Sequence, residues 1–225
     1  MTTPLVTAIV PVFNGARFLA QALDSIAAQT HQPIEIIVVD DGSTDGSDVI
    51  ASSREVLVIK QPQRGVAAAR NVGIAAARTP IIALLDQDDL WLPRKIERQV
   101  DALHAHPENV SLVLNEFFLE PPLTAPPRWF AKPELFDAPH PGYAPSCLAF
   151  TRDTFERVGA FNESFAQASD LDWIARAKKL GVTFELVDEL LVRKRIHETN
   201  DSGSATSFRE MMQVVRAAAA QRRNA

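Results

Sequence analysis

Apolar runs recur through the first half of the chain and predict buried strands. Four of them are rich in β-branched and other apolar residues, namely Leu5–Val12, Ile34–Asp41, Val56–Lys60 and Pro80–Asp86. The segments between them show helical periodicity or are rich in small helix-forming residues. Because strands alternate with helices, we expect an α/β fold with a mostly parallel, Rossmann-like sheet and helices on both faces.

The helices are predicted from one-sided apolar positions and from signals at their ends. The first helix carries its apolar residues on one face, at Leu19, Ala22, Leu23 and Ile26. Ser43 or Thr44 is expected to cap a second helix over about residues 45–53. Gly65 is expected to open a third, alanine-rich helix, and Pro93 suits the first turn of a fourth. The fourth helix carries three apolar residues on one face, at Ile96, Val100 and Leu103.

The second half of the chain has a less regular pattern. Val110–Phe118 and Phe184–His197 predict strands, and Asp170–Leu180 predicts a helix. Eight of the fifteen prolines lie between Pro121 and Pro145, which predicts an irregular loop. Its aromatic residues either anchor the loop or face a sugar, and anchoring is favoured because aromatic side chains bury large areas. These residues are Trp129, Phe130, Phe136 and Tyr143.

A last helix is predicted near the end of the sequence, over Ser207–Arg223. Its apolar stripe consists of Phe208, Met211, Met212, Val215 and Ala219. We expect this stripe to dock on the protein's own core, although an adapter that binds a partner through it is an alternative. No apolar run approaches the roughly 20 residues that span a bilayer, so no integral membrane segment is expected.

Composition and charge exclude several classes of protein. Hydrophobic residues make up 46% of the 225 residues, which allows a sizeable core. The formal net charge of −5 argues against nucleic acid as a partner, because such proteins usually present a basic face. Cys147 is the single cysteine, so the fold does not depend on an internal disulfide. A soluble cytoplasmic protein is the default expectation.

Polar residues cluster where the predicted strands end. They are Asn14, Asp40, Asp41, Asp86 and Asp88. Ligands of α/β sheets bind outside the carboxyl ends of the strands, so this clustering predicts a site. The run LLDQDD brings three carboxylates to one strand end, and carboxylates approach a diphosphate only with a cation between them. The alternative is that Asp89 caps the next helix while the other two acids are solvated.

Two further groups of residues have both a binding and a structural interpretation. DDGSTD could be a turn with a helix cap, but two adjacent acids after a buried strand also suit a base N–H or a ribose hydroxyl. Arg70 lies in the alanine-rich helix and either pairs with acids or contacts a ligand. Arg193, Arg195 and His197 alternate on one strand face and could form a phosphate-facing patch.

These blocks together resemble the family 2 inverting glycosyltransferases, which have the GT-A fold. The matching blocks are PVFN (Pro11–Asn14), DDGSTD (Asp40–Asp45), RGVAAARNVGI (Arg64–Ile74) and LLDQDDLW (Leu84–Trp91), followed by residues 147–165 and 168–181. The resemblance implies a GT-A domain over residues 1–203. Its nucleotide-binding half covers about 1–119 and its smaller acceptor-side half about 120–203, and a C-terminal helix occupies 204–225.

The resemblance also implies roles for particular residues. The nucleotide would be held by Pro11, Phe13, Asn14, Asp40, Asp41, Arg70, Asp86, Gln87 and Asp88. Asp88 would be the direct ligand of Mn²⁺ or Mg²⁺, Asp86 would lie nearer the ribose or a metal-bound water, and His197 would lie near the diphosphate or metal.

The expected catalytic base is Asp170. The family usually has Glu-Asp at this point, whereas this chain has Ser169-Asp170, and Asp172 is a competing candidate. On a helix, Asp170 and Asp172 lie about 200° apart, so only one can face the donor.

The function implied is transfer of a sugar from a nucleotide-diphosphate sugar, with UDP favoured, in a hexosyltransferase-type reaction with inversion. The acceptor would be a carbohydrate, a lipid-linked molecule or a peptide. One alternative is a non-catalytic nucleotide-sugar-binding protein of the same fold. Another is a nucleotidyltransferase, which the missing early glycine-rich loop disfavours.

Overall fold

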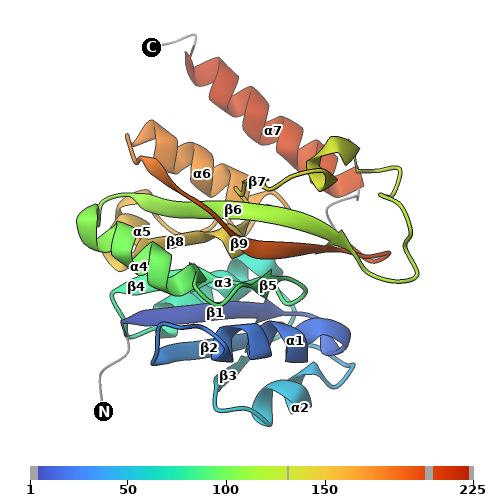
Figure 1. Ribbon diagram of the computed structural model, residues 1–225. Coiled ribbons are helices and arrows are strands. Elements are labelled where there is room, and N and C mark those ends of the chain that lie inside the picture. Colours follow the sequence, from blue (N-terminus) through green and yellow to red (C-terminus); the bar gives the residue numbers. More distant parts are fainter. Residues whose placement is uncertain (1–4, 131, 201–204, 223–225) are drawn as a thin grey trace.

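The computed structural model describes residues 5–130, 132–200 and 205–222. Strands and helices alternate through the first half, and a long loop interrupts the second half (Figure 1). The elements up to residue 119 are β1 Val6–Val12, α1 Ala16–Ala27, β2 Ile34–Asp40, α2 Ser47–Ser52, β3 Leu57–Lys60, α3 Val66–Ala76, β4 Ile81–Leu84, β5 Leu90–Trp91, α4 Lys95–Ala105 and β6 Val110–Leu119. The later elements are the short helix Pro133–Phe136, β7 His140–Pro141, the turn Pro145–Cys147, β8 Leu148–Thr151, α5 Arg152–Val158, α6 Ser169–Lys179, β9 Phe184–Ile196 and α7 Ala205–Arg222.

The nine strands of the described residues form one sheet. Its order is β3-β2-β1-β4-β8-β6-β9-β5, and β7 pairs with β6. The strands β1, β2, β3 and β4 run parallel, as do β6 and β9, whereas β8 lies antiparallel between β4 and β6. The predicted α/β fold is confirmed. Because β8 is inserted antiparallel, the sheet is mixed and not fully parallel. Hydrophobic periodicity does not specify strand direction.

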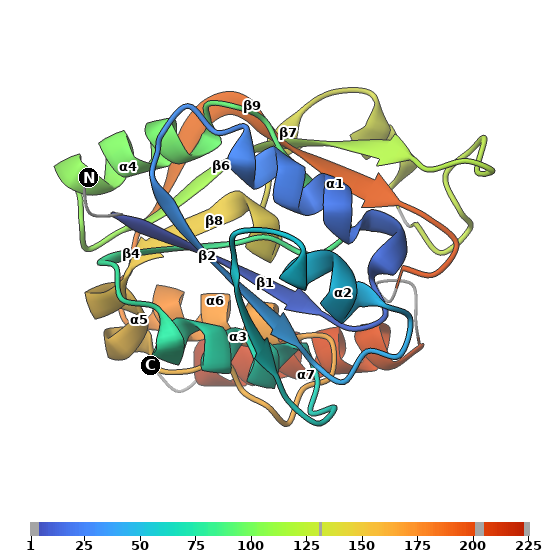
Figure 2. The same cartoon turned by 90° about the horizontal axis from the view of Figure 1, so that it is seen from below.

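Helices cover both faces of this sheet, as predicted (Figure 2). Alternate residues of β1 explain the two layers, because side chains of a strand point to opposite faces. Val10 packs in the cluster that contains Leu19 of α1 and Val100 of α4. Ile9 packs in the other cluster, with Ile74 of α3 and Trp173 of α6. Truncating one such buried aliphatic side chain to alanine costs about 2–5 kcal/mol.

The start of α2 differs from the sequence prediction. The helix begins at Ser47 after the N-cap Gly46, whose φ is 90°, and Asp45 Oδ1 accepts a hydrogen bond from Ser47 N at 3.1 Å. Ser43 Oγ instead accepts a hydrogen bond from Asn14 N at 2.9 Å, and Asn14 Oδ1 accepts one from Thr44 N at 2.9 Å. The capping prediction is therefore wrong, because these polar groups join the loop after β1 to the loop after β2.

The fourth helix also begins later than predicted, since Pro93 precedes its N-cap residue, Arg94. Its predicted apolar face is buried, with Ile96, Val100 and Leu103 all at most 5% exposed.

The proline-rich loop is anchored by aromatic contacts. Phe117 of β6 lies 4.9 Å from Phe130 and 5.6 Å from Phe136 between ring centroids. Anchoring is thus confirmed for Phe130 and Phe136. Tyr143 is 42% exposed and lies 6.1 Å from the ring of Phe184.

The C-terminal helix α7 lies against α6 but does not bury its whole apolar stripe. Met211 is 36% exposed and Val215 is 54% exposed, so the prediction that the stripe docks on the core is wrong for these two residues. The side chains of Phe208 and Ala219 lie outside the described residues. Among the helices described, none has the length and apolar character to cross a membrane.

Candidate active site

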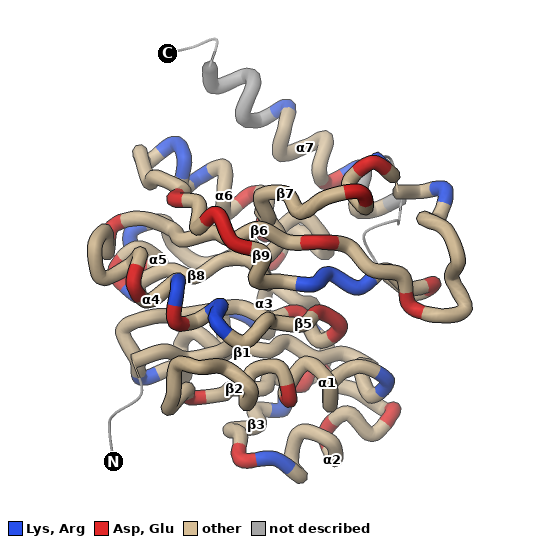
Figure 3. The backbone as a smooth tube through the Cα atoms, viewed as in Figure 1, with Lys and Arg blue, Asp and Glu red and all other residues tan. Residues whose placement is uncertain are grey.

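The acids after β4 lie beside the basic end of β9. The strand β5 follows these acids directly and pairs antiparallel with β9, which places Leu90 opposite Arg193. Figure 3 shows Lys and Arg of β9 close to Asp and Glu near β5. The ends of β1 and β2 reach the same edge, because β2, β1 and β4 are parallel neighbours. The polar residues predicted at strand ends are therefore gathered at one edge of the sheet.

Asp86 is held between two cationic side chains. Its Oδ1 accepts a hydrogen bond from Arg70 Nη2 at 2.8 Å, and its Oδ2 lies 3.9 Å from Lys194 Nζ. Burial opposes the ionisation of Asp86, but Arg70 and Lys194 outweigh it and lower the pKa of this carboxyl group. Arg70 Nε is buried without a hydrogen-bond partner among the described residues. Arg70 is thus a buried ion-pair partner of Asp86.

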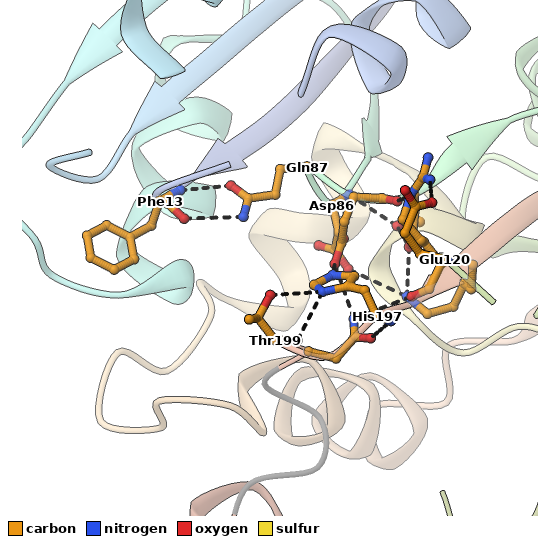
Figure 4. A network of polar contacts seen from close by, with 12 residues as sticks. Phe13, Asp86, Gln87, Glu120, His197 and Thr199 are labelled. Atoms are coloured by element: carbon orange, nitrogen blue, oxygen red, sulfur yellow. Dashed lines mark hydrogen bonds and ion pairs between the residues drawn. The ribbon is translucent and has the colours of Figure 1, made fainter. Parts of the chain in front are cut away.

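Asp88 meets His197 across the site, and Figure 4 shows the His197 ring next to Thr199. His197 Nε2 lies 2.9 Å from Asp88 Oδ2, and His197 Nδ1 lies 2.9 Å from Thr199 Oγ1. His197 is only 6% exposed, and its ring packs 4.7 Å from that of Phe18. The structure therefore places this histidine inside the site, although a histidine at a strand end is often on the surface.

Asp89 is the most buried acid of the run, at 1% exposure. Its Oδ2 accepts hydrogen bonds from Lys194 Nζ at 2.7 Å and Ser146 Oγ at 2.5 Å, and its Oδ1 accepts one from Arg195 N at 3.1 Å. Burial raises the pKa of Asp89, against the attraction of Lys194, and repulsion from Asp88 adds to the rise. The alternative in which Asp89 caps the next helix is wrong.

Lys194 is the residue of this site that sequence analysis missed. Burial alone would lower its pKa, but attraction from the surrounding carboxylates raises it instead. The flanking arginines have other partners, because Arg193 pairs with Glu116, and Arg195 pairs with Glu120. Both arginines thus have carboxylate partners, and the phosphate-facing arginine patch stays a prediction. Of the three basic residues at this end of β9, Lys194 is the one whose ammonium group reaches Asp86 and Asp89.

The two acids after β2 differ in how much of their hydrogen-bonding capacity is used. Asp41 Oδ1 accepts hydrogen bonds from Gln61 Nε2 at 2.7 Å and Arg64 N at 2.8 Å, and its Oδ2 accepts one from Gly65 N at 2.7 Å. Asp40 Oδ1 accepts one from Ser43 N at 2.9 Å. Asp41 thus ties the start of α3 to β2, whereas Asp40 keeps an oxygen for a ligand.

Gln87 links the acid run to the end of β1 (Figure 4). Its Oε1 accepts a hydrogen bond from Phe13 N at 2.9 Å, and its Nε2 donates one to Phe13 O at 3.2 Å. A Cβ at Gly15 would lie 2.3 Å from Gln87 Oε1, so glycine leaves room for this clamp. Pro11 is buried in β1, and the Phe13 side chain is 40% exposed at its end.

Asp170 and Asp172 of α6 have different surroundings. Asp172 Oδ2 accepts a hydrogen bond from Arg176 Nε at 2.9 Å on the same helix. Burial raises the pKa of Asp170, while Arg70 attracts its charge and Asp86 repels it. Asp170 is thus close enough to Arg70 and Asp86 for their charges to act on it, whereas Asp172 pairs with Arg176 of its own helix.

A metal ion would have two protein ligands here. No group of three or more His, Cys, Asp or Glu side chains in the described parts of the chain is arranged to hold one. Asp88 and His197 do converge, and carboxylate oxygen with imidazole nitrogen is a donor set that divalent metals accept. Such a pair fits a cation whose other positions are filled by diphosphate oxygens and water.

Solved structures show the same architecture. The crystal structure of S. aureus TarS 1–349 in complex with UDP-GlcNAc matches with a TM-score of 0.70 and 20% identity, over 96% of this chain and 65% of that one. The complex of the same protein with UDP gives a TM-score of 0.68 and 19% identity, over 95% and 64% of the two chains. This class of fold is the GT-A fold of glycosyltransferases.

Sequence comparisons give the family. The family model described as Glycosyl transferase family 2 matches residues 7–159. An uncharacterized glycosyltransferase of Rickettsia typhi is 31% identical over 217 residues, or 90% of this chain and 67% of that protein. Glycosyltransferase GlyG of Streptococcus pneumoniae is 39% identical over 99 residues, or 41% of this chain and 33% of that protein. The chain belongs to glycosyl transferase family 2 and spans about two thirds of the length of its Rickettsia relative.

Proposed function

We propose that the protein transfers a sugar, in a hexosyltransferase-type reaction, from a UDP-linked donor to an acceptor hydroxyl with inversion at the anomeric carbon. The observation that carries this proposal is the convergence of Asp170, Asp86 and Arg70 at the edge of the sheet where α/β proteins bind nucleotides. UDP is the favoured nucleotide because the TarS structures contain UDP and UDP-GlcNAc. The acceptor is a carbohydrate, a lipid-linked molecule or a peptide.

The nucleotide is proposed to lie between the ends of β1 and β2. Pro11 and Phe13 border this position, with Asn14 and Gln87 holding the loop, and Asp40 offers its spare oxygen to the base or ribose. Asp41 supports the same pocket from behind through the start of α3. These contacts orient the donor, which lowers the entropic part of the barrier.

The proposed chemistry is a direct displacement. The acceptor oxygen forms a bond to the anomeric carbon while the bond from that carbon to the diphosphate oxygen breaks, and the hydroxyl proton passes to Asp170. The raised pKa of Asp170 makes it a stronger base than an exposed aspartate. Arg70 and Lys194 provide positive charge near the departing diphosphate.

A divalent metal is part of this proposal. Apart from His197, which lies beside Asp88, the carboxylates of Asp86, Asp88 and Asp89 have two cationic partners among the described residues, Arg70 and Lys194. A negative charge therefore remains to attract a further cation. Mn²⁺ or Mg²⁺ held by Asp88 and His197, with Asp86 near it, would neutralise charge on the diphosphate.

The test is the substitution Asp170→Asn in the full chain. We expect UDP affinity, measured by calorimetry with Mn²⁺, to stay within a factor of about two, while turnover of UDP-sugar falls by about 10²–10⁴ because a general base is lost. The matched control is Asp172→Asn, which removes an acid from the same helix turn and is expected to keep turnover near normal. Near-normal turnover in Asp170→Asn would remove this residue from the reaction.

The second candidate function is nucleotide-sugar binding without catalysis. The feature that favours it is Ser169, which stands where the family usually has Glu. It predicts UDP-sugar binding with neither transfer nor donor hydrolysis, even with Mn²⁺ present.

A further inference from the structure

The C-terminal helix α7 is attached to the segment that leads into α6. Glu210 Oε1 accepts a hydrogen bond from Ala166 N at 2.9 Å, and Glu210 Oε2 accepts one from Gln167 N at 2.7 Å and one from Ala168 N at 3.0 Å. Partial burial opposes the ionisation of Glu210, but these three donors outweigh it and lower its pKa. One charged side chain thus fixes three consecutive peptide groups.

These peptide groups end two residues before Asp170. The N-cap of α6 is Ala168, which makes no side-chain capping hydrogen bond, and Asp170 Oδ1 accepts a hydrogen bond from Leu171 N at 2.8 Å. Ser169 is fully buried, and its Oγ has no hydrogen-bond partner among the described residues. A helix start leaves backbone N–H groups unpaired, and an acid near them is favoured by the helix dipole. The first turn of α6 contains Asp170 and Asp172, and Glu210 of α7, about 40 residues further along the chain, adds an acid that binds the N-cap amide of Ala168.

We propose that Glu210 is a positioning residue that fixes the start of α6 and thereby holds the Asp170 carboxylate toward Arg70 and Asp86. This inference rests on the function proposed above. Asp170 is the second residue of α6, so a shift of the helix start displaces it directly. A misplacement of about 1 Å at a reacting group can cost about 10²-fold in rate. The C-terminal helix would then contribute to turnover without touching the donor.

The first variant for the test is Glu210→Gln, which keeps the side-chain length but removes the charge and one acceptor oxygen. We expect kcat to fall by about tenfold or more, UDP affinity to stay within about twofold, and hydrogen exchange at the amides of residues 166–168 to become faster. Glu210→Asp keeps the charge on a shorter side chain and is expected to have an intermediate kcat. The control is Gln213→Ala, an exposed position of α7 that is expected to change none of these quantities.

A double-mutant cycle separates positioning from general stabilisation. If Glu210 acts through Asp170, Glu210→Gln should lower kcat by less than about twofold further in an Asp170→Asn background. An equal loss in both backgrounds would overturn the inference, as would an unchanged kcat in Glu210→Gln despite faster exchange at 166–168. Near-normal turnover in Asp170→Asn alone would instead remove Asp170 from the reaction, and a wild-type chain without UDP-sugar turnover would overturn the proposed function. The two failures therefore give different results.

Discussion

Two lysines lie inside this protein, and their surroundings are opposite. Lys194 of β9 has its Nζ 2.7 Å from Asp89 Oδ2 at the candidate site. Lys95 of α4 is fully buried in the core, with its Nζ 3.8 Å from the centroid of the Trp91 ring and no hydrogen bond within the described residues. Burial lowers the pKa of Lys95 to about 7, whereas carboxylates raise that of Lys194 above its ordinary value.

This difference shows that the candidate site contains both a cation and the carboxylates that stabilise its charge. Burial disfavours the charged form of both lysines, so the opposite pKa directions come from their partners. Asp89 and Lys194 each need the other, because a buried charge without a partner is costly. Within the described residues, the Lys95 amine lies against the aromatic face of Trp91 and makes no hydrogen bond. Stability and its pH dependence can test this contrast.

The largest effect is expected for Lys194→Met. The substitution leaves Asp89 buried without a cation, and breaking such a pair typically costs about 3–5 kcal/mol. The free energy of unfolding, measured by urea denaturation, should fall by that amount. Lys60→Met is the control, since Lys60 forms an exposed ion pair with Asp48 and its loss should change stability little. Equal stability of both variants would contradict this interpretation.

A smaller effect with the opposite sign is expected for Lys95→Met. Methionine keeps most of the apolar length of lysine and removes a buried, unpaired amine. We expect the free energy of unfolding at pH 7 to rise by about 1–3 kcal/mol, the usual cost of burying an unsatisfied polar group. Urea denaturation of Lys95→Met and Lys194→Met in parallel measures the expected gain and the expected loss of unfolding free energy. A loss of stability here would mean that the Trp91 contact outweighs desolvation.

The sequence was sufficient to predict which faces of the helices are buried. The apolar faces of α1 and α4 were predicted because a buried stripe repeats with the helical period. Local polar signals were less reliable. Ser43 and Thr44 resemble helix caps, but the same polar groups bond to Asn14 about 30 residues away.

The position of the candidate site was predictable from the sequence, but the ion pairs within it were not. Strand ends brought Asp86, Asp88 and Asp40 to one edge, since parallel neighbours end together. Lys194 was not predicted because its partner, Asp89, lies 105 residues away in the sequence. The residues on either side of Lys194 are also basic, so it does not stand out from them. The hydrogen bond from Ala168 N to Glu210 was not predicted for the same reason, because tertiary packing determines contacts between residues so far apart in the sequence.

The last expected effect is the change of these differences with pH, which is at most about 1.4 kcal/mol for each pH unit. The pKa of Lys95 is about 7 in the folded protein and about 10.4 in an unfolded chain. The unfolded state therefore binds more protons between these values, so this residue makes wild-type stability rise with pH across them.

Lys95→Met lacks this contribution, and its gain over wild type should shrink from pH 7 toward pH 10, by at most about 1.4 kcal/mol per pH unit. Lys194 has a raised pKa, so its contribution is complete below about pH 10 and is lost only above. The deficit of Lys194→Met should not shrink over the same range. Removing Lys194 raises the pKa of Asp89 further, so ionisation of this buried carboxyl group makes the deficit grow with pH. Urea denaturation at pH 7, 8, 9 and 10 measures both differences, and groups whose surroundings are the same in the compared proteins cancel. A constant gain for Lys95→Met would mean that its amine is charged in the core, and the two lysines would then differ in partners but not in protonation.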